Sequence, residues 1–120
     1  MSRLALLAAG VLLALLVAGT ASAHSLLLES TPPANATVVG APERITLRFN
    51  NRIEKRLCRV RLVDGAGATH ALAVRPADGG ADELVASVPS LSPGAYRVEW
   101  QVFSTDGHVV SGAFPFRIGG

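Results

Sequence analysis

Two places in the sequence carry the side chains best suited to binding a metal ion. The first is His24, which directly follows Ala21-Ser22-Ala23. That small-x-small sequence is the pattern that signal peptidase accepts. The second is the segment Asp106-Gly107-His108, in which a carboxylate and an imidazole flank a glycine. Together the two segments offer nitrogen and oxygen donors for one ion.

Residues 1–23 are predicted to be a signal peptide that is removed on export. Arg3 supplies the positive charge, and Leu4 to Gly19 form an uninterrupted apolar run. An uncleaved membrane anchor is the alternative, because a run of this length is close to the minimum that spans a bilayer. The cleavage sequence and the polar residues behind it favour removal. The mature chain is then His24 to Gly120, a single domain of 97 residues.

Charge and cysteine content limit the classes of function. Without Arg3, the mature chain has ten basic and nine acidic residues. A phosphate-binding surface needs a clear basic excess, so nucleic-acid binding is not expected. Cys58 is the only cysteine and can form no internal disulfide. Its place on the apolar face of an alternating segment predicts a buried structural thiol rather than a metal ligand.

Cleavage before His24 would create a chelating pair of nitrogens. The α-amine and the ring Nδ1 of an N-terminal histidine can close a six-membered ring on one ion. Reference pKa values of about 7.7–8.0 for an α-amine and about 6.5 for imidazole make their deprotonation easy near neutral pH. Asp106 and His108 would add a carboxylate oxygen and a third nitrogen. This mixed set suits a tetragonal Cu(II) centre; zinc could use the same ligands, but the Irving–Williams order favours Cu(II).

Each segment also has a simpler interpretation. Asp-Gly is primarily a turn signal, and a single histidine in such a turn is often only a surface residue. The residues alone therefore leave a metal site and an accidental arrangement both open. His70, beside Thr69 and without an acidic neighbour, is interpreted as an exposed residue at a strand end. The sequence has no phosphate-binding loop, cysteine pair or nucleophile motif.

The mature chain has the pattern of an all-β domain. Turn residues interrupt it about every ten positions, and most segments between them alternate apolar with polar residues. Short strands at this spacing, without an amphipathic helix, predict a two-sheet Greek-key sandwich of the immunoglobulin or cupredoxin kind. About seven strands are predicted: 24–28, 44–50, 58–63, 70–75, 83–88, 95–104 and a last strand that ends in the alternating residues Phe114, Phe116 and Ile118.

These motifs resemble those of the copper-resistance protein CopC family, a group of periplasmic copper carriers. The resemblance begins at His24, continues through Pro42 and Phe49, and covers essentially the whole mature chain. It is densest in the sequence LSPGAYRVEWQVFSTDGH, which starts at Leu91 and is followed by Gly112, Phe114 and Phe116. This stretch is similar to the family hallmark L-x-P-G-x-Y-x-V-x-W … S-x-D-G-H-x-x-x-G-x-F-x-F.

The resemblance implies a seven-stranded cupredoxin-like or immunoglobulin-like β-sandwich or barrel that binds Cu(II) through His24, Asp106 and His108. Met1 is the only methionine and leaves with the signal peptide, so the thioether Cu(I) site of some family members is impossible here. Family members often have an acidic residue where this chain has Asn50-Asn51. Whether one of these asparagines or a water completes the site stays open.

The leading hypothesis is a monomeric periplasmic Cu(II) carrier or buffer in copper homeostasis and resistance. It would sequester copper or pass it to a membrane copper transporter of the CopD type, without catalysis of its own. One alternative is a copper-dependent oxidative enzyme with a histidine brace, although a small domain leaves little area for a polysaccharide and Asp106 would occupy the position that oxygen needs. The other is a metal-independent structural sandwich, which predicts no Cu(II)-dependent rise in melting temperature.

Overall fold

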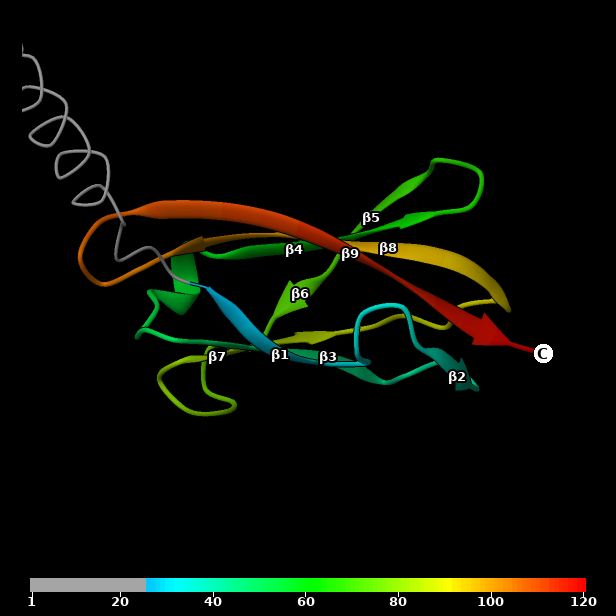
Figure 1. Ribbon diagram of the computed structural model, residues 1–120, viewed down its shortest axis with the longest axis horizontal. Helices are drawn as coiled ribbons and strands as arrows, with labels where there is room; N and C mark the ends of the chain where they lie inside the picture. The colour runs from blue at the N-terminus through cyan, green and yellow to red at the C-terminus, as the bar shows by residue number, and fades with distance from the viewer. Residues whose placement is uncertain (1–25) are drawn as a thin grey trace, which may run out of the picture.

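The computed structural model describes residues 26–120, which form two β-sheets packed on one core (Figure 1). The predicted signal peptide, His24 and Ser25 lie outside the described residues. Within 26–120 there is no helix long and apolar enough to cross a membrane. In chain order the elements are β1 (Leu27–Thr31), β2 (Thr37–Val39), β3 (Arg44–Phe49), the 3-10 helix η1 (Lys55–Leu57), β4 (Arg59–Asp64), β5 (Thr69–Ala71), β6 (Ala73–Val74), β7 (Glu83–Ser87), β8 (Gly94–Phe103) and β9 (Val109–Gly119).

One sheet has four strands in the order β1-β3-β7-β6, and the other has five in the order β2-β9-β8-β4-β5. The pair β2 and β9 is parallel, and the other neighbours are antiparallel. β8 and β9 form a long hairpin whose paired residues run from Gly94 and Ile118 to Phe103 and Val109. The turn of this hairpin is the segment that contains Asp106 to His108, so the hairpin fixes where these side chains lie.

The core follows from the alternation of side chains along the strands. In β3, Ile45, Leu47 and Phe49 are fully buried. In β8, the face predicted from the sequence is buried at every second residue from Tyr96 to Val102. Successive side chains of a strand point to opposite faces of the sheet, so each of these strands gives half of its residues to the core. The predicted all-β, two-sheet fold is confirmed.

The described chain has nine strands, whereas about seven were expected. β2 lies in a segment for which no strand was predicted; it is only three residues long, and only Val38 among them is half-buried. The expected strand 70–75 is divided at Leu72, a buried residue at which the chain passes from the five-stranded to the four-stranded sheet. The first strand continues to Thr31, beyond its expected end at Leu28.

Cys58 is buried, as its position in the alternating segment predicted, with 5% of its surface exposed. Its thiol donates to the carbonyl oxygen of Glu54 at 3.2 Å, and the backbone N–H of Phe103 donates to Sγ at 3.5 Å. Burial raises the pKa of the Cys58 thiol. Because the thiolate is the reactive and metal-binding form, Cys58 is a structural core residue.

Candidate metal centre

The turn between β8 and β9 is closed by backbone hydrogen bonds at its base. The N–H of Ser104 donates to the carbonyl of His108 at 2.9 Å, and the N–H of Gly107 donates to the carbonyl of Ser104 at 2.9 Å. Gly107 has a φ of +89°, a conformation that glycine adopts without steric cost. The tight backbone at Gly107 lets the side chains on either side of it approach each other.

Asp106 and His108 lie in contact across this glycine. The distance between Asp106 Oδ2 and His108 Nδ1 is 3.2 Å. The other carboxylate oxygen, Oδ1, accepts hydrogen bonds from the Ser104 hydroxyl and from the His108 backbone N–H, the latter at 3.3 Å. About half of each side chain surface is exposed, 50% for Asp106 and 56% for His108. An ion arriving from solvent can therefore reach both groups.

Ser104 lies beneath the turn and lowers the pKa of the Asp106 carboxyl. It is buried, with 3% of its surface exposed, and its hydroxyl donates to the Asp106 carboxylate. This hydrogen bond, followed by those from His108, holds the pKa of the Asp106 carboxyl below its usual range. Asp106 is thus kept as the anion, the form that binds a cation.

Residues 50–54 join this turn to the start of β1. At one end, the N–H of Thr105 donates to the carbonyl of Arg52 at 3.2 Å, and Ile53 forms a β-bridge with Ser104. At the other end, the N–H of Leu26 donates to Asn50 Oδ1 at 2.7 Å, and the N–H of Asn50 donates to the carbonyl of Leu26 at 3.1 Å. One short segment therefore contacts both the Asp106 turn and the residue from which the chain leads to His24.

The structure brings together two of the three predicted ligands. Asp106 and His108 meet in the turn, while His24 lies outside the described residues. Among residues 26–120, no group of three or more histidine, cysteine, aspartate and glutamate side chains could hold a metal ion. The roles of Ser104 and Asn50 were missed from the sequence. Ser104 could have been suspected, because a serine side chain in a turn often forms hydrogen bonds with groups a few residues away.

A concavity of about 880 Å³ lies elsewhere, over β4, β5, β8 and β9. Its lining includes Arg61, Leu72, Trp100 and Gly112 but neither Asp106 nor His108. Asp106 and His108 therefore lie on an exposed turn outside this hollow.

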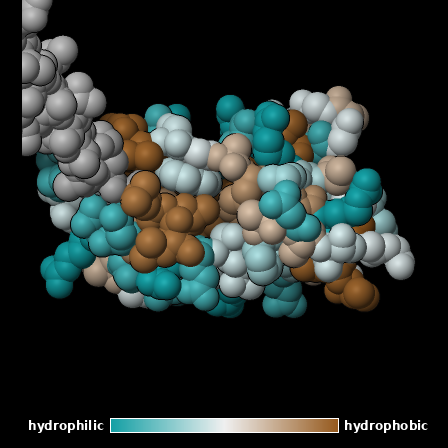
Figure 2. Space-filling view, viewed as in Figure 1, coloured by the Kyte–Doolittle hydropathy of each residue, from teal (hydrophilic) through white to brown (hydrophobic). Residues whose placement is uncertain are grey.

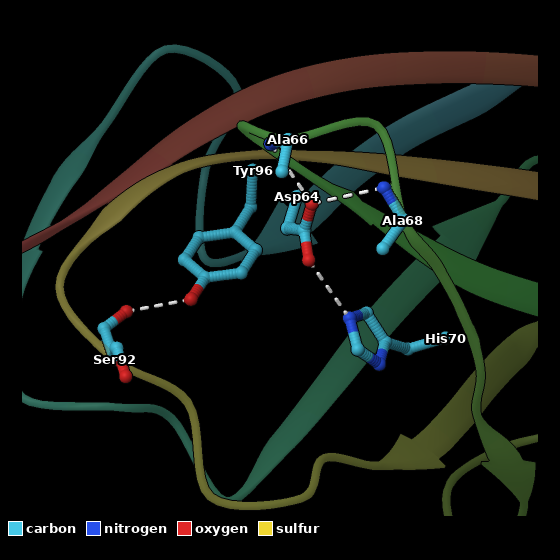
Figure 3. A network of polar contacts seen from close by, with 6 residues as sticks. All are labelled: Asp64, Ala66, Ala68, His70, Ser92 and Tyr96. Atoms are coloured by element: carbon cyan, nitrogen blue, oxygen red, sulfur yellow. Dashed lines mark hydrogen bonds and ion pairs between the residues drawn. The ribbon is translucent and has the colours of Figure 1, made fainter.

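A second aspartate and histidine pair lies in the hairpin between β4 and β5 (Figure 3). His70 Nε2 is 3.1 Å from Asp64 Oδ2, and Asp64 Oδ1 accepts the N–H groups of Ala66 and Ala68 at 2.9 Å each. The interpretation of His70 as an exposed residue without an acidic neighbour was wrong. The hairpin pairs the strands so that residues 64 and 70 meet, and His70 is half-buried.

Replacing His70 with alanine is expected to raise the pKa of Asp64. The hydrogen bond from His70, followed by those from Ala68 and Ala66, lowers the pKa of this carboxyl in the folded chain. A lowered folded-state pKa adds stability above the unfolded-state value, and that stability is lost as the pH falls through the folded-state value. NMR titration of the Asp64 carboxyl in His70→Ala should show the rise, and Asp106 should titrate unchanged. An unaltered Asp64 would contradict the assignment.

Comparison with known proteins gives consistent matches. The chain matches the CopC domain over residues 27–119. Copper resistance protein C of Pseudomonas syringae pv. tomato is 34% identical over 111 residues, which cover 87% of this chain and 87% of that protein. The crystal structure of CopC from Methylosinus trichosporium OB3b has a TM-score of 0.75 at 29% identity, covering 79% of this chain and 93% of that one.

The crystal structure of PcoC, a methionine-rich copper resistance protein from Escherichia coli, has a TM-score of 0.67 at 28% identity and covers 81% of this chain and all of that one (100%). The matched range 27–119 contains both sheets, the segment 50–54 and the turn with Asp106 and His108. The domain match covers most of the sequence, and the relatives are covered over most of their length. This chain therefore belongs to the CopC family.

Proposed function

We propose that the mature chain, His24 to Gly120, is a periplasmic Cu(II) carrier or buffer in copper homeostasis and resistance. The ligands would be the α-amine and imidazole of His24 together with Asp106 and His108. The observation that carries the proposal is the contact of Asp106 with His108 beside residues 50–54, which also bind Leu26. Two residues of extended chain reach at most about 7 Å, so His24 would be within a short distance of Leu26.

The chemistry of the donor set supports Cu(II) as the cargo. A carboxylate and neutral nitrogen donors suit a tetragonal Cu(II) site. The Ser104 hydroxyl keeps Asp106 ionised, so this oxygen needs no deprotonation at neutral pH. Met1 is the only methionine, so the mature chain has no thioether with which to hold Cu(I). In this respect the chain differs from its methionine-rich relative PcoC.

The surface of the domain supports a carrier without catalysis. Five of the six aromatic residues are buried, and Phe103 is half-buried. Enzymes that act on polysaccharides commonly use surface aromatic side chains that stack on sugar rings. The half-exposed turn is instead suited to exchanging an ion with a partner. We propose that the chain acts as a monomer and that this partner is a membrane copper transporter of the CopD type.

Replacing His108 with alanine is expected to lower Cu(II) affinity by at least about 100-fold, since even the loss of a group that only orients a ligand costs about 10–100-fold. The matched control is His70→Ala, which removes the other imidazole that contacts an aspartate. Calorimetric titration of both variants with Cu(II), together with the rise in melting temperature that a tight ligand must cause, measures the effect. Equal binding by the two variants would contradict the proposed site.

A further inference from the structure

Asn50 binds Leu26 through both backbone groups of that residue. Its Oδ1 accepts the Leu26 N–H at 2.7 Å, and its own N–H donates to the Leu26 carbonyl at 3.1 Å. The side-chain atom facing the Leu26 N–H must be the oxygen, because the amide nitrogen of asparagine is a donor only. One of the two lone pairs of this carbonyl oxygen is therefore engaged by a backbone hydrogen bond, which orients the side chain toward Leu26.

Within residues 26–120, few other contacts hold the beginning of β1. Its pairing with β3 shifts register between Leu27 and Glu29, so the regular ladder is interrupted one residue after it starts. Leu26 and Leu28 expose 61% and 53% of their surface, and Figure 2 shows hydrophobic surface on the face that carries β1. Leu27 alone of the three packs against the core. The Asn50 hydrogen bonds thus fix the backbone where side-chain burial does not.

The same segment fixes the other half of the proposed site. Arg52 accepts the N–H of Thr105, Ile53 bridges to Ser104, and Glu54 donates its N–H to the carbonyl of Phe103 at 2.8 Å. Asn50 lies at one end of this segment and the residues before Asp106 lie at the other. Only Ser25 separates Leu26 from His24, so the direction of the chain at Leu26 decides how His24 approaches Asp106 and His108.

We infer that Asn50 is a positioning residue for the copper site: it holds Leu26 so that His24 is directed at Asp106 and His108, and it is not itself a ligand. The inference rests on the proposed function. It predicts that what matters at position 50 is a hydrogen-bond acceptor for the Leu26 N–H. Aspartate meets that requirement, because its carboxylate oxygen has the same reach, and alanine does not.

The test compares Asn50→Ala, Asn50→Asp and the control Glu29→Gln in the exported protein. Glu29→Gln removes the ion pair between Glu29 and Arg48, which also joins β1 to β3 but lies away from Leu26. Without metal, hydrogen exchange at the Leu26 amide should accelerate in Asn50→Ala only. Cu(II) affinity should fall roughly tenfold in that variant, as expected for one lost hydrogen bond, and its EPR spectrum should change. Asn50→Asp should retain both the protection and the binding.

Hydrogen exchange with Cu(II) bound separates positioning from ligation. If Asn50 only positions Leu26, the Leu26 amide stays protected in the copper complex; if Oδ1 moves to the metal, that protection is lost and the inference is overturned. Unchanged Cu(II) affinity in Asn50→Ala would also overturn it. If Asn50→Ala fails to fold, Asn50→Asp decides the question: weak Cu(II) binding by a folded Asn50→Asp variant would overturn the inference. If variants that lack His24 or His108 bind Cu(II) as tightly as the unmodified chain, the proposed function itself fails. If only the effect of Asn50 is absent, that function still stands.

Discussion

In the proposed mature chain, one extra residue ahead of His24 should lower the Cu(II) affinity by at least about 100-fold, the upper end of what the loss of an orienting group costs. The extension converts the α-amine into a peptide nitrogen. The lone pair of a peptide nitrogen is delocalised into the carbonyl group, and this nitrogen binds a metal only after losing its proton, so the neutral amine donor of the six-membered chelate ring with the His24 imidazole is lost. Calorimetric titration gives the affinity, and EPR of the Cu(II) complex should show a changed set of nitrogen ligands.

When the residue added ahead of His24 is glycine, a glycine added after Gly120 is the matched control, because it changes the mass equally and leaves His24 untouched. The uncleaved precursor should behave like the chain extended at His24. Unchanged Cu(II) binding in the extended chain would show that the α-amine is not a ligand, although Asp106 and His108 could still bind copper as a pair. Intact mass of the exported protein, measured with and without Cu(II), reports the cleavage position and the number of copper ions together.

The sequence predicted those parts of the fold that depend on neighbouring residues. Alternation in β3 and β8 follows from the two-residue period of a strand, so the buried faces of Ile45 to Phe49 and Tyr96 to Val102 could be identified. β2 could not be identified in this way, because it is defined by its pairing with β9, about eighty positions away. The division of the expected strand at Leu72 likewise depends on which sheet each half joins.

The same distinction holds for the candidate site. Asp106 and His108 are two positions apart, and a glycine between them is enough to predict their contact. The Asp64 and His70 contact was missed because it depends on the hairpin that pairs β4 with β5. The bond between Asn50 and Leu26 spans 24 residues, and nothing in the local sequence indicates it. Asn50 was therefore considered only as a ligand.

Gly112 is where β9 passes closest to the buried indole of Trp100. The two residues are paired across β8 and β9. A Cβ atom at position 112 would lie 2.3 Å from Trp100 Cζ2 and 2.7 Å from Cε2. The ring is 8% exposed and its centroid is 5.2 Å from that of Phe49 in an edge-to-face contact, so moving it away from an added methyl group would disturb this packing. Trp100 Nε1 has no hydrogen-bond partner within 26–120, so packing alone holds the ring.

Gly112→Ala should therefore destabilise the domain by about 1–3 kcal/mol, the usual range for an overpacked core. For a domain of this size that corresponds to a fall in melting temperature of about 4–8 °C per kcal/mol. The matched control is Gly119→Ala in the same strand, where the nearest atom to an added Cβ is 3.5 Å away. Equal stabilities of the two variants would contradict the packing argument. In a Trp100→Phe background the smaller ring leaves room for the methyl group, so Gly112→Ala should cost less there, and the double-mutant cycle isolates the contact between residues 100 and 112.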